Sequence, residues 1–356
     1  MTHALVTGAT GFIGYHVVRE LRSQGCDVSC LVRPESNRSR IEAYRPCFIS
    51  GDVNDREAIS SALRGVDVVY HLAGATKALS TRTLERVNVD GVRNVAACCA
   101  KMSTPPVLVI MSSLAAAGPS IDGMSRSERD VPAPVSEYGH SKLAGEYAAA
   151  RYAGDVPISI VRPPIVLGEA DRDGLSLFSP IARWGVHFIP SLRDERFSII
   201  HASDLALAVT FIAVKGQRLP ANHSDPSCGV YYATTGAPPT YRELGQMIAK
   251  SFDRESLHCV RTPIAAVWGI AAVNELLSKV RHQPSILSLD KAREATAGSW
   301  TCTGAALRRD TQFVPAFSLQ QRINQTSQWY VDQGWLKAPS AWRKKHPRVF
   351  AKHAHD

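Results

Sequence analysis

An apolar segment that runs directly into three evenly spaced glycines most constrains how this chain can fold. Residues 4–7 have the composition of a buried strand, and Gly8, Gly11 and Gly14 follow at the spacing G-x-x-G-x-x-G. Gly8 lets the backbone reverse, Gly11 leaves room for a pyrophosphate, and Gly14 lets the next helix pack closely on a sheet. The free N–H groups at that helix's start would then face the phosphate charge. The pattern predicts a phosphate-binding strand, turn and helix; the alternative is a purely structural turn.

The first half of the chain continues as short apolar strands that alternate with amphipathic helices. Strands are expected at 27–32, 47–51, 66–71, 106–112 and 157–161, and helices at 55–63, 83–101 and 137–152. Nearly all-apolar strands of this kind are typical of a parallel sheet that is covered on both faces. Right-handed crossovers then give a doubly wound Rossmann sheet of the α/β class.

The alternation of strands and helices ends after Arg162, where loops dominate and the helices are scattered. Helices are expected at 202–214, 240–252, 264–280 and 319–333. We predict a nucleotide-binding domain over residues 1–165, to which 197–235 partly returns. Residues 166–340 would form most of a smaller substrate-binding lobe over the strand ends, and 341–356 a basic tail.

Composition narrows the class of protein. The chain has 356 residues, a net charge of +9 and eight cysteines without C-x-x-C spacing. The histidines form no metal-binding motif, so we assign no metal. Because the first strand begins by Ala4, no signal peptide is expected, and reduced thiols fit a cytoplasmic protein.

Two segments could contact a nucleic acid or a membrane. The basic tail is interpreted as a solvated end, and no pattern supports nucleic-acid binding. The apolar run from Pro263 to Val273 is too short to span a bilayer. We expect a buried or lid helix there, with contact to a membrane surface as the alternative.

A second motif could carry chemistry. Ser112 and Ser113 end the strand at 106–112, and Tyr138 and Lys142 follow at positions i and i+4 of an expected helix. A phenol titrates near about 10, so it is a poor base at neutral pH. A lysine ammonium one turn away would favour the phenolate, and Tyr138 could then accept or donate a proton. A serine hydroxyl at the strand end could hydrogen-bond the same substrate oxygen.

With these motifs in view, the chain resembles the extended short-chain dehydrogenase/reductases, the family of NAD(P)-dependent epimerases, dehydratases and reductases. The resemblance covers residues 4–250 well and continues weakly to about 336. Beyond the glycine turn and Ser113, Tyr138 and Lys142, it depends on five further segments. These are 51–53, 71–74, 88–94, 162–168 and 201–205.

The resemblance implies a role for each matching residue. Tyr138 would donate or accept the proton, Ser113 would polarise the carbonyl, and Lys142 would also hold the nicotinamide ribose. Asn88 would support either an active-site water or its helix, and Asp204 would start a helix as its N-cap beside a structural His201. The remaining residues implied to contact the cofactor are Gly8, Thr10, Gly11, Phe12, Ile13 and Gly14 in the turn, Asp52 and Val53 at the adenine, Leu72, Ala73 and Gly74 along its path, and Pro163 and Val166 at the nicotinamide.

The end of the second strand bears on the choice of cofactor. NAD-binding units usually place an Asp or Glu there, whereas this chain has Arg33. A guanidinium pairs with a 2′-phosphate that a carboxylate would repel. We therefore favour NADP(H) over NAD(H); the alternative is a solvated Arg33 and an NAD enzyme.

The residues after Ser113 bear on the reaction. Sugar-nucleotide 4,6-dehydratases carry an Asp-Glu pair where this chain has Leu114 and Ala115, so water elimination is not expected. Leu167 stands where many sugar enzymes have Tyr, and 264–273 would suit a lid over an apolar ligand. The chain looks more like the dihydroflavonol-reductase and 3β-hydroxysteroid-dehydrogenase branch. We predict an oxidoreductase that interconverts a secondary alcohol and a ketone on a largely apolar molecule.

Two other functions remain open. One is a nucleotide-sugar epimerase that retains NAD, and the other is a non-catalytic NADP-binding sensor. A homodimer is also expected from the resemblance, through the helices at 83–101 and 137–152. The apolar residues that permit this pairing could instead face the sheet: Val92, Val95, Ala96, Leu143 and Ala144.

Overall fold

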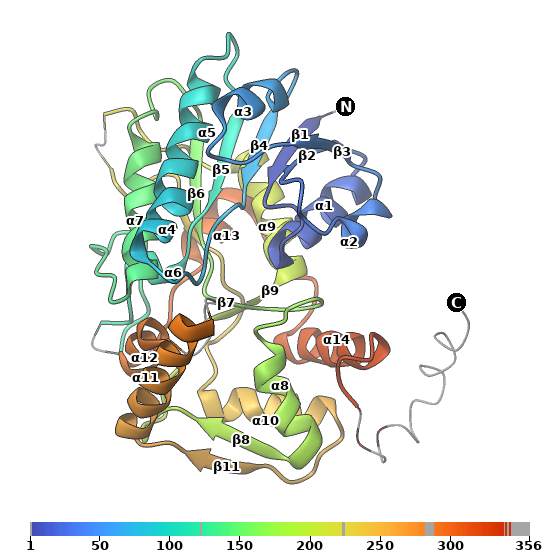
Figure 1. Ribbon diagram of the computed structural model, residues 1–356, viewed down its shortest axis with the longest axis vertical. Coiled ribbons are helices and arrows are strands. Elements are labelled where there is room, and N and C mark those ends of the chain that lie inside the picture. Colours follow the sequence, from blue (N-terminus) through green and yellow to red (C-terminus); the bar gives the residue numbers. More distant parts are fainter. Residues whose placement is uncertain are drawn as a thin grey trace.

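The doubly wound sheet that the strand pattern predicts is present, with one strand more than expected. The computed structural model describes residues 2–121, 123–222, 225–281, 288–337, 339 and 342. Within them, seven parallel strands lie in the order β10-β6-β5-β4-β1-β2-β3 (Figure 1). Their bounds are β1 His3–Thr7, β2 Asp27–Val32, β3 Cys47–Ser50, β4 Val68–His71, β5 Val107–Met111, β6 Ile158–Arg162 and β10 Val230–Tyr232. The order reverses between β1 and β4, where ligands bind in such sheets.

Helices cover both faces of this sheet (Figure 1). One face carries α1 Phe12–Ser23, α2 Ser39–Glu42, α9 Ala202–Lys215 and α13 Ala305–Thr311. The other carries α3 Arg56–Ala62, α5 Gly91–Ala100 and α7 Glu137–Ala150. Each face has its own apolar core, because every strand presents side chains to both sides. Val17 and Val209 lie in one core, and Ile59 and Val95 in the other.

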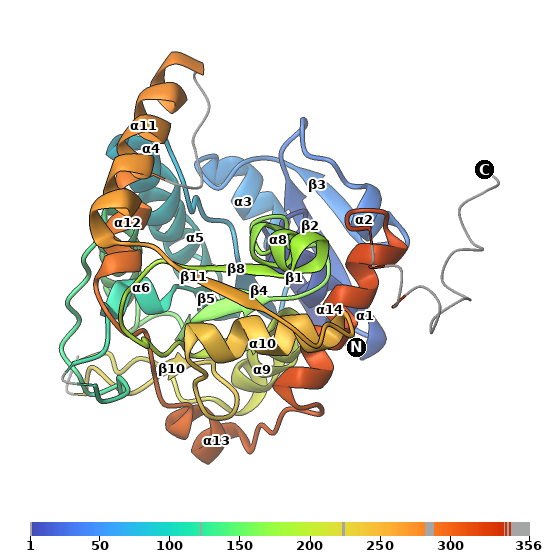
Figure 2. The ribbon, with the colours of Figure 1, turned by 90° about the horizontal axis from the view of Figure 1, so that it is seen from below.

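A smaller lobe lies beyond the carboxyl ends of the strands (Figures 1 and 2). It contains α8 Leu175–Trp184, β8 Val186–Ile189, α10 Tyr241–Ser251, β11 His258–Arg261 and α14 Leu319–Asp332. Phe178, Ile248 and Tyr330 are fully buried in its core. Two three-residue strands, β7 Ile165–Leu167 and β9 Ile199–His201, pair with each other between the two parts. The strands β7, β8, β9 and β11 were not predicted, because segments of three or four residues show too little hydrophobic periodicity.

The helix expected at 83–101 is interrupted. The chain forms α4 Thr81–Glu85, then a π-helical turn, η1 Arg86–Asp90, and only then α5. Val92, Val95 and Ala96 face the core beneath this helix and are almost fully buried. Of the five residues considered for a dimer interface, only Leu143 and Ala144 on α7 retain exposed surface. Dimerisation stays a prediction, with α7 as the helix that could still contribute.

Two elements, α6 Leu114–Ala117 and α12 Leu289–Thr296, lie at the start of α7. The short α6 follows β5, and α11 Ile264–Arg281 packs on α12 at one side of the small lobe (Figure 2). Of the expected buried or lid helix, the buried form is wrong, since Ile270 and Val273 are more than half exposed; the lid and the membrane contact stay predictions. Within the described residues, none of the helices is long and apolar enough to cross a membrane. Residues 343–356 of the expected basic tail lie outside the described part of the chain.

Candidate active site

The glycine turn has the backbone geometry that a bound pyrophosphate needs. Gly8 has φ +70°, and a Cβ there would lie 2.6 Å from Ala73 N on the loop after β4. A Cβ on Gly14 would overlap Gly8 O, so α1 can approach β1 only through a glycine. Gly11 is exposed, and a Cβ on it would meet only Gly8 O at 3.2 Å. The turn is thus closed by Gly8 and Gly14 and open at Gly11, where a phosphate could approach the first N–H groups of α1.

The other residues implied to contact the cofactor line the same end of the sheet. Gly74 is exposed, and a Cβ there would lie 3.3 Å from Asn88 Oδ1 and 3.5 Å from Lys142 Nζ. Arg33 is 60% exposed and pairs with Glu35 at 3.2 Å, so its guanidinium remains accessible. Thr10, Phe12, Ile13, Asp52, Leu72, Ala73 and Val166 are half-buried, and Val53 and Pro163 are buried. Their assignment to parts of the cofactor stays a prediction.

Ser113 and Tyr138 come together from two different elements. Ser113 is the N-cap of α6, and its Oγ accepts a hydrogen bond from Ala115 N at 3.1 Å. Tyr138 lies in the first turn of α7, close enough to Ser113 for that hydroxyl to oppose part of the rise that burial causes in the pKa of Tyr138. A substrate oxygen placed between these two hydroxyls would contact both. This is the arrangement that carbonyl polarisation and proton transfer require.

The expected electrostatic role of Lys142 needs a correction. Burial raises the pKa of Tyr138 above its ordinary value, and the cation that opposes this rise is Lys291 rather than Lys142. Lys291 Nζ lies 5.2 Å from the centre of the Tyr138 ring. Lys142 Nζ instead donates to Met111 O at 2.6 Å, at the end of β5. Lys142 is therefore anchored on the end of β5, and a different lysine favours the phenolate.

Lys142 belongs to a buried charged network. Burial lowers its pKa to about 8, while the carboxylate of Glu146, one turn further along α7, opposes this shift. Arg162 binds Glu146 through Nε at 2.9 Å and Nη2 at 2.5 Å, and Ser112 also donates to Glu146. The carboxylate of Glu146 is thus shared by two buried cations, which is consistent with the lowered pKa of Lys142.

Three residues of α12 that were not predicted from the sequence lie at the start of α7. Asp290 accepts hydrogen bonds from Glu137 N at 2.7 Å and Tyr138 N at 3.1 Å. Glu294 accepts one from Ser136 Oγ at 2.6 Å and also pairs with Lys291 at 2.6 Å. Carboxylates are stabilising at a helix N-terminus, whose first N–H groups have no partner within the helix. No sequence motif marks these residues, since about 150 positions separate them from α7.

Asn88 and His71 complete the surroundings of the lysine. Asn88 lies in the π-turn; its Nδ2 donates to Ala75 O and to Ser141 Oγ, each at 2.9 Å. Asn88 thus ties the loop after β4 to α7, which favours the supporting role over the water-binding one. His71 Nδ1 bonds Thr7 Oγ1 at 2.9 Å, and burial lowers its pKa to about 3. Its Nε2 is buried without a hydrogen-bond partner among the described residues.

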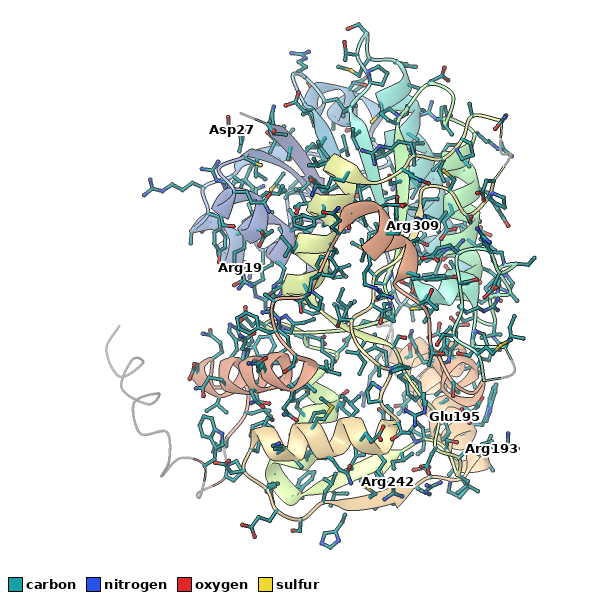
Figure 3. The ribbon with its side chains drawn as sticks, turned by 180° about the vertical axis from the view of Figure 1, so that it is seen from behind. Arg19, Asp27, Arg193, Glu195, Arg242 and Arg309 are labelled. Atoms are coloured by element: carbon teal, nitrogen blue, oxygen red, sulfur yellow. The ribbon has the colours of Figure 1, made fainter. Side chains whose placement is uncertain are left out.

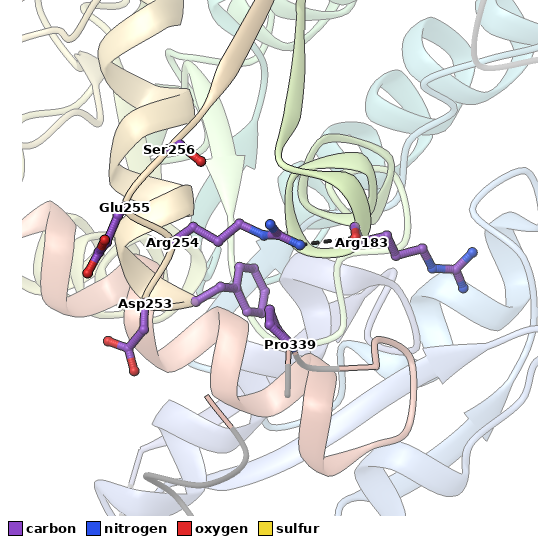
Figure 4. A pocket seen from close by; sticks show the side chains of 7 residues that line it. Arg183, Asp253, Arg254, Glu255, Ser256 and Pro339 are labelled. Carbon is purple, nitrogen blue, oxygen red and sulfur yellow. Dashed lines mark hydrogen bonds between the residues drawn. The ribbon is translucent and has the colours of Figure 1, made fainter. Parts of the chain in front are cut away.

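A hollow on the small lobe lies away from these residues. It has a volume of about 540 Å³ and is lined by Arg254, Phe252 and Arg183, among others (Figure 4). Arg254 spans it and donates to the carbonyls of Ala182 and Arg183 at 2.7 and 3.0 Å. Because Arg254 serves to cap the end of α8, this hollow has a structural role.

The class of protein follows from fold and site together: a doubly wound sheet with an open glycine turn beside paired serine and tyrosine hydroxyls is typical of nicotinamide-dependent enzymes. The model of the NAD dependent epimerase/dehydratase family matches residues 4–224. The chain belongs to this family, the extended short-chain dehydrogenase/reductases. It is an NAD(P)-dependent oxidoreductase, as the resemblance implied.

Its relatives include reductases and dehydrogenases. The ceramide reductase of Caulobacter vibrioides is 30% identical over 333 residues, covering 93% of this chain and 95% of the relative. The 3 beta-hydroxysteroid dehydrogenase type 7 of Homo sapiens is 26% identical and covers 91% of this chain and 94% of its own. Among solved structures, UDP-glucose 4-epimerase from Thermotoga maritima superposes with a TM-score of 0.73 at 17% identity, covering 93% of this chain and 99% of its own. This last likeness shows the fold alone.

Proposed function

We propose that this protein reduces a ketone to a secondary alcohol, or the reverse, on a largely apolar lipid-like molecule, with NADP(H) as cofactor. The observation that carries the proposal is the apolar wall beside Tyr138. Leu114, Ala115 and Ala117 of α6 form one buried cluster with Trp300, and Tyr138 packs against that cluster. The side chains of Leu114, Ala115 and Ala117 bring no hydrogen-bonding group to this side of Tyr138, and sugar hydroxyls buried without partners are costly.

The relatives agree with this choice of substrate class. Two of them are named for ceramide and for a hydroxysteroid, both large apolar molecules. The position after Ser113 carries Leu114 and Ala115 rather than an acid and a base, so the site is equipped for proton transfer at one oxygen. This favours a simple exchange between alcohol and ketone over elimination of water.

The residues of the site divide the work on the reacting oxygen. The nicotinamide, when bound, supplies or accepts the hydride. Ser113 would donate a hydrogen bond to the carbonyl oxygen, and Tyr138 would transfer its hydroxyl proton to the same oxygen as the alcohol forms. In the oxidation the phenolate of Tyr138 would take that proton back. Lys142, beside the exposed Gly74, would hold the ribose hydroxyls.

The NADP(H) preference is supported by the exposed guanidinium of Arg33. Its partner Glu35 is itself 66% exposed, so the pair can open at little cost and a 2′-phosphate can replace the carboxylate. Fluorescence titration of the purified protein with NADPH and with NADH measures the preference. We expect the tighter binding for NADPH, and equal binding would contradict this part of the proposal.

Replacement of the tyrosine tests the reaction. We expect Tyr138→Phe to lower kcat for NADPH-dependent reduction of long-chain ketones by roughly 100-fold or more, while NADPH binding remains. Tyr147→Phe is the matched control, because Tyr147 lies on the same helix and is 61% exposed. The assay follows NADPH absorbance, and the titration above follows binding.

Each other function gives a distinct result in the same assays. A retained-cofactor epimerase would purify with bound NAD and interconvert nucleotide-sugar epimers without consuming added cofactor. Full turnover in Tyr138→Phe would rule out the proton role of this residue and with it the proposed mechanism.

A further inference from the structure

Helix α11 presents an apolar face to the surroundings over four turns. Its outward positions are Ala265, Ala266, Gly269, Ile270, Ala272, Val273, Leu276 and Leu277, all of them exposed. None carries a polar side chain. Val273 and Leu276 are 60% and 65% exposed. Figure 2 shows α11 along the edge of the molecule, projecting beyond the elements around it.

The outward side of this helix is apolar, whereas its inner side mixes the apolar Trp268 and Ala271 with polar residues. The half-buried positions on its inner side include Asn274 and Glu275, next to Trp268. A surface helix usually turns its apolar stripe inward and its charges outward. An apolar stripe turned outward marks a site of contact with another apolar phase.

Further apolar residues extend this face at the start of α11. Phe188 and Val260 lie side by side on β8 and β11 and are 54% and 44% exposed. Leu192, 60% exposed, lies in the next loop, where its carbonyl accepts a hydrogen bond from Arg261 at the end of β11. β11 ends three residues before α11 begins, so these exposed residues lie close to the start of α11 in the chain.

We propose that α11 and these neighbouring residues dock on the surface of an anionic lipid bilayer. Exposed arginines lie near both ends of the stripe. Arg281 ends α11, and Arg193, which is labelled in Figure 3, follows Leu192. The net charge of the chain is +9. An apolar helix face flanked by cations is typical of helices that lie in the plane of an anionic membrane surface.

A second copy of the chain is less suited than a bilayer to cover this face. The described outward face of α11 is short and consists mostly of Ala, Gly and Val, whereas a stable interface uses roughly 20–30 residues a side. A bilayer needs no complementary shape, so a short stripe of side chains is enough for reversible attachment.

The position of α11 links attachment to the active site. Helix α11 packs on α12, and α12 binds the start of α7 through Asp290 and places Lys291 over the Tyr138 ring. A lipid that leaves the bilayer beside α11 therefore needs to pass only one helix to reach Tyr138. This inference deepens the proposed function and rests on it for the nature of the substrate.

One substitution on the stripe and a matched one elsewhere test the docking surface. Val273→Asp should lower the affinity of the full chain for vesicles of phosphatidylcholine and phosphatidylglycerol by about tenfold or more, as measured by co-sedimentation. Val214→Asp is the control, because Val214 is 79% exposed on α9, in the nucleotide-binding part. Leu276→Ala is a milder second variant and should weaken binding less.

The readouts separate this inference from the proposed function. Reduction of a short, water-soluble ketone should be unchanged in all three variants, while reduction of a vesicle-embedded ketone should fall in Val273→Asp. Failure of the wild-type chain to bind vesicles, or equal binding by Val273→Asp, would overturn the docking surface. A wild-type dimer that Val273→Asp converts to a monomer, without vesicle binding, would assign the face to a second copy. If no ketone is reduced, the proposed function fails, and vesicle binding still decides the docking surface.

Discussion

At the scale of single residues, the Tyr138/Lys142 motif assigns both ribose binding and stabilisation of the phenolate to Lys142. In this structure two lysines share these roles. Lys142 is anchored on Met111 O, and Lys291, from the other end of the chain, lies over the Tyr138 ring. Lys291 lowers a pKa that burial has raised. The proton-transfer residue is thus tuned by a side chain that belongs to the substrate lobe.

Removal of this second cation should shift the pH dependence of the reaction. In Lys291→Met the pKa of Tyr138 rises, because the cation that favours the phenolate is lost. Reduction needs the protonated phenol, so its alkaline limb moves to higher pH. Oxidation needs the phenolate, so its acid limb also moves to higher pH, and the rate at fixed pH falls by less than the roughly 100-fold that general acid–base catalysis supplies.

Profiles of kcat against pH in both directions measure this shift. Lys291→Arg should restore the wild-type profile, because it keeps the charge, and Lys250→Met on the exposed side of α10 should not change it. A merely structural Lys291 would lower the rate at every pH and leave both limbs where they are.

At the scale of elements, the site depends on how closely α7 crosses the π-turn η1. The π-turn turns Asn88 toward the loop after β4 and toward α7. A Cβ on Gly145 would overlap Asn88 O, so the two segments touch through backbone atoms. π-Turns of this kind occur frequently at functional sites, where they aim a side chain that a regular helix would misplace.

A pair of glycine substitutions tests this crossing. Gly145→Ala should lower the free energy of unfolding by about 1–3 kcal/mol, because the added methyl group pushes α7 from η1. It should also reduce turnover, since Lys142 lies one turn away. Gly269→Ala, on exposed α11, has nothing within 4 Å of its Cβ and should raise stability by about 0.5–1 kcal/mol. Urea denaturation measures both, and equal effects would contradict the close crossing.

At the scale of the whole molecule, buried neutral histidines lie where the chain's distant segments meet. His16 on α1 bonds Glu169 O at 2.8 Å, beyond the sheet, and its ring lies 6.1 Å from that of His201. Burial lowers the pKa of His16 to about 3 and of His201 to about 2. His71, between β1 and α7, has a pKa of about 3 for the same reason.

These groups should make the fold sensitive to acid. A histidine with a folded pKa below the unfolded value near about 6.5 contributes stability above that pH and loses it as the pH falls toward 3. Burial raises the pKa of Asp171 to about 6, so protonation of this carboxyl stabilises the fold as the pH falls below 6. That gain offsets the stability lost through one of the three histidines. The net effect is a loss of about 3 kcal/mol for each pH unit between 6 and 4.

Denaturation midpoints measured from pH 7 to pH 4 check this slope. His71→Asn should reduce it by about 1.4 kcal/mol per pH unit, because the amide keeps the bond to Thr7 and does not titrate. Stability that is unchanged between pH 7 and pH 5 would show that these histidines are not neutral in the folded chain.

Much of the fold could be predicted because its signals are local. The alternation of apolar strands and helices in the first half, and the glycines that close a single turn, depend on neighbouring residues. β10 was not predicted, because its place at the edge of the sheet is set by pairing with β6 rather than by its own three residues.

The amino-acid sequence alone determined the doubly wound sheet, the open glycine turn and the pairing of Tyr138 with Lys142 on one helix. Each of these follows from backbone sterics or periodicity within a few residues. Only the tertiary structure decided that Lys291 lies over Tyr138, that Val92 and Val95 face the core, and that α11 turns its apolar side outward. Burial and electrostatic contact depend on which distant segments meet, and no local pattern encodes that meeting.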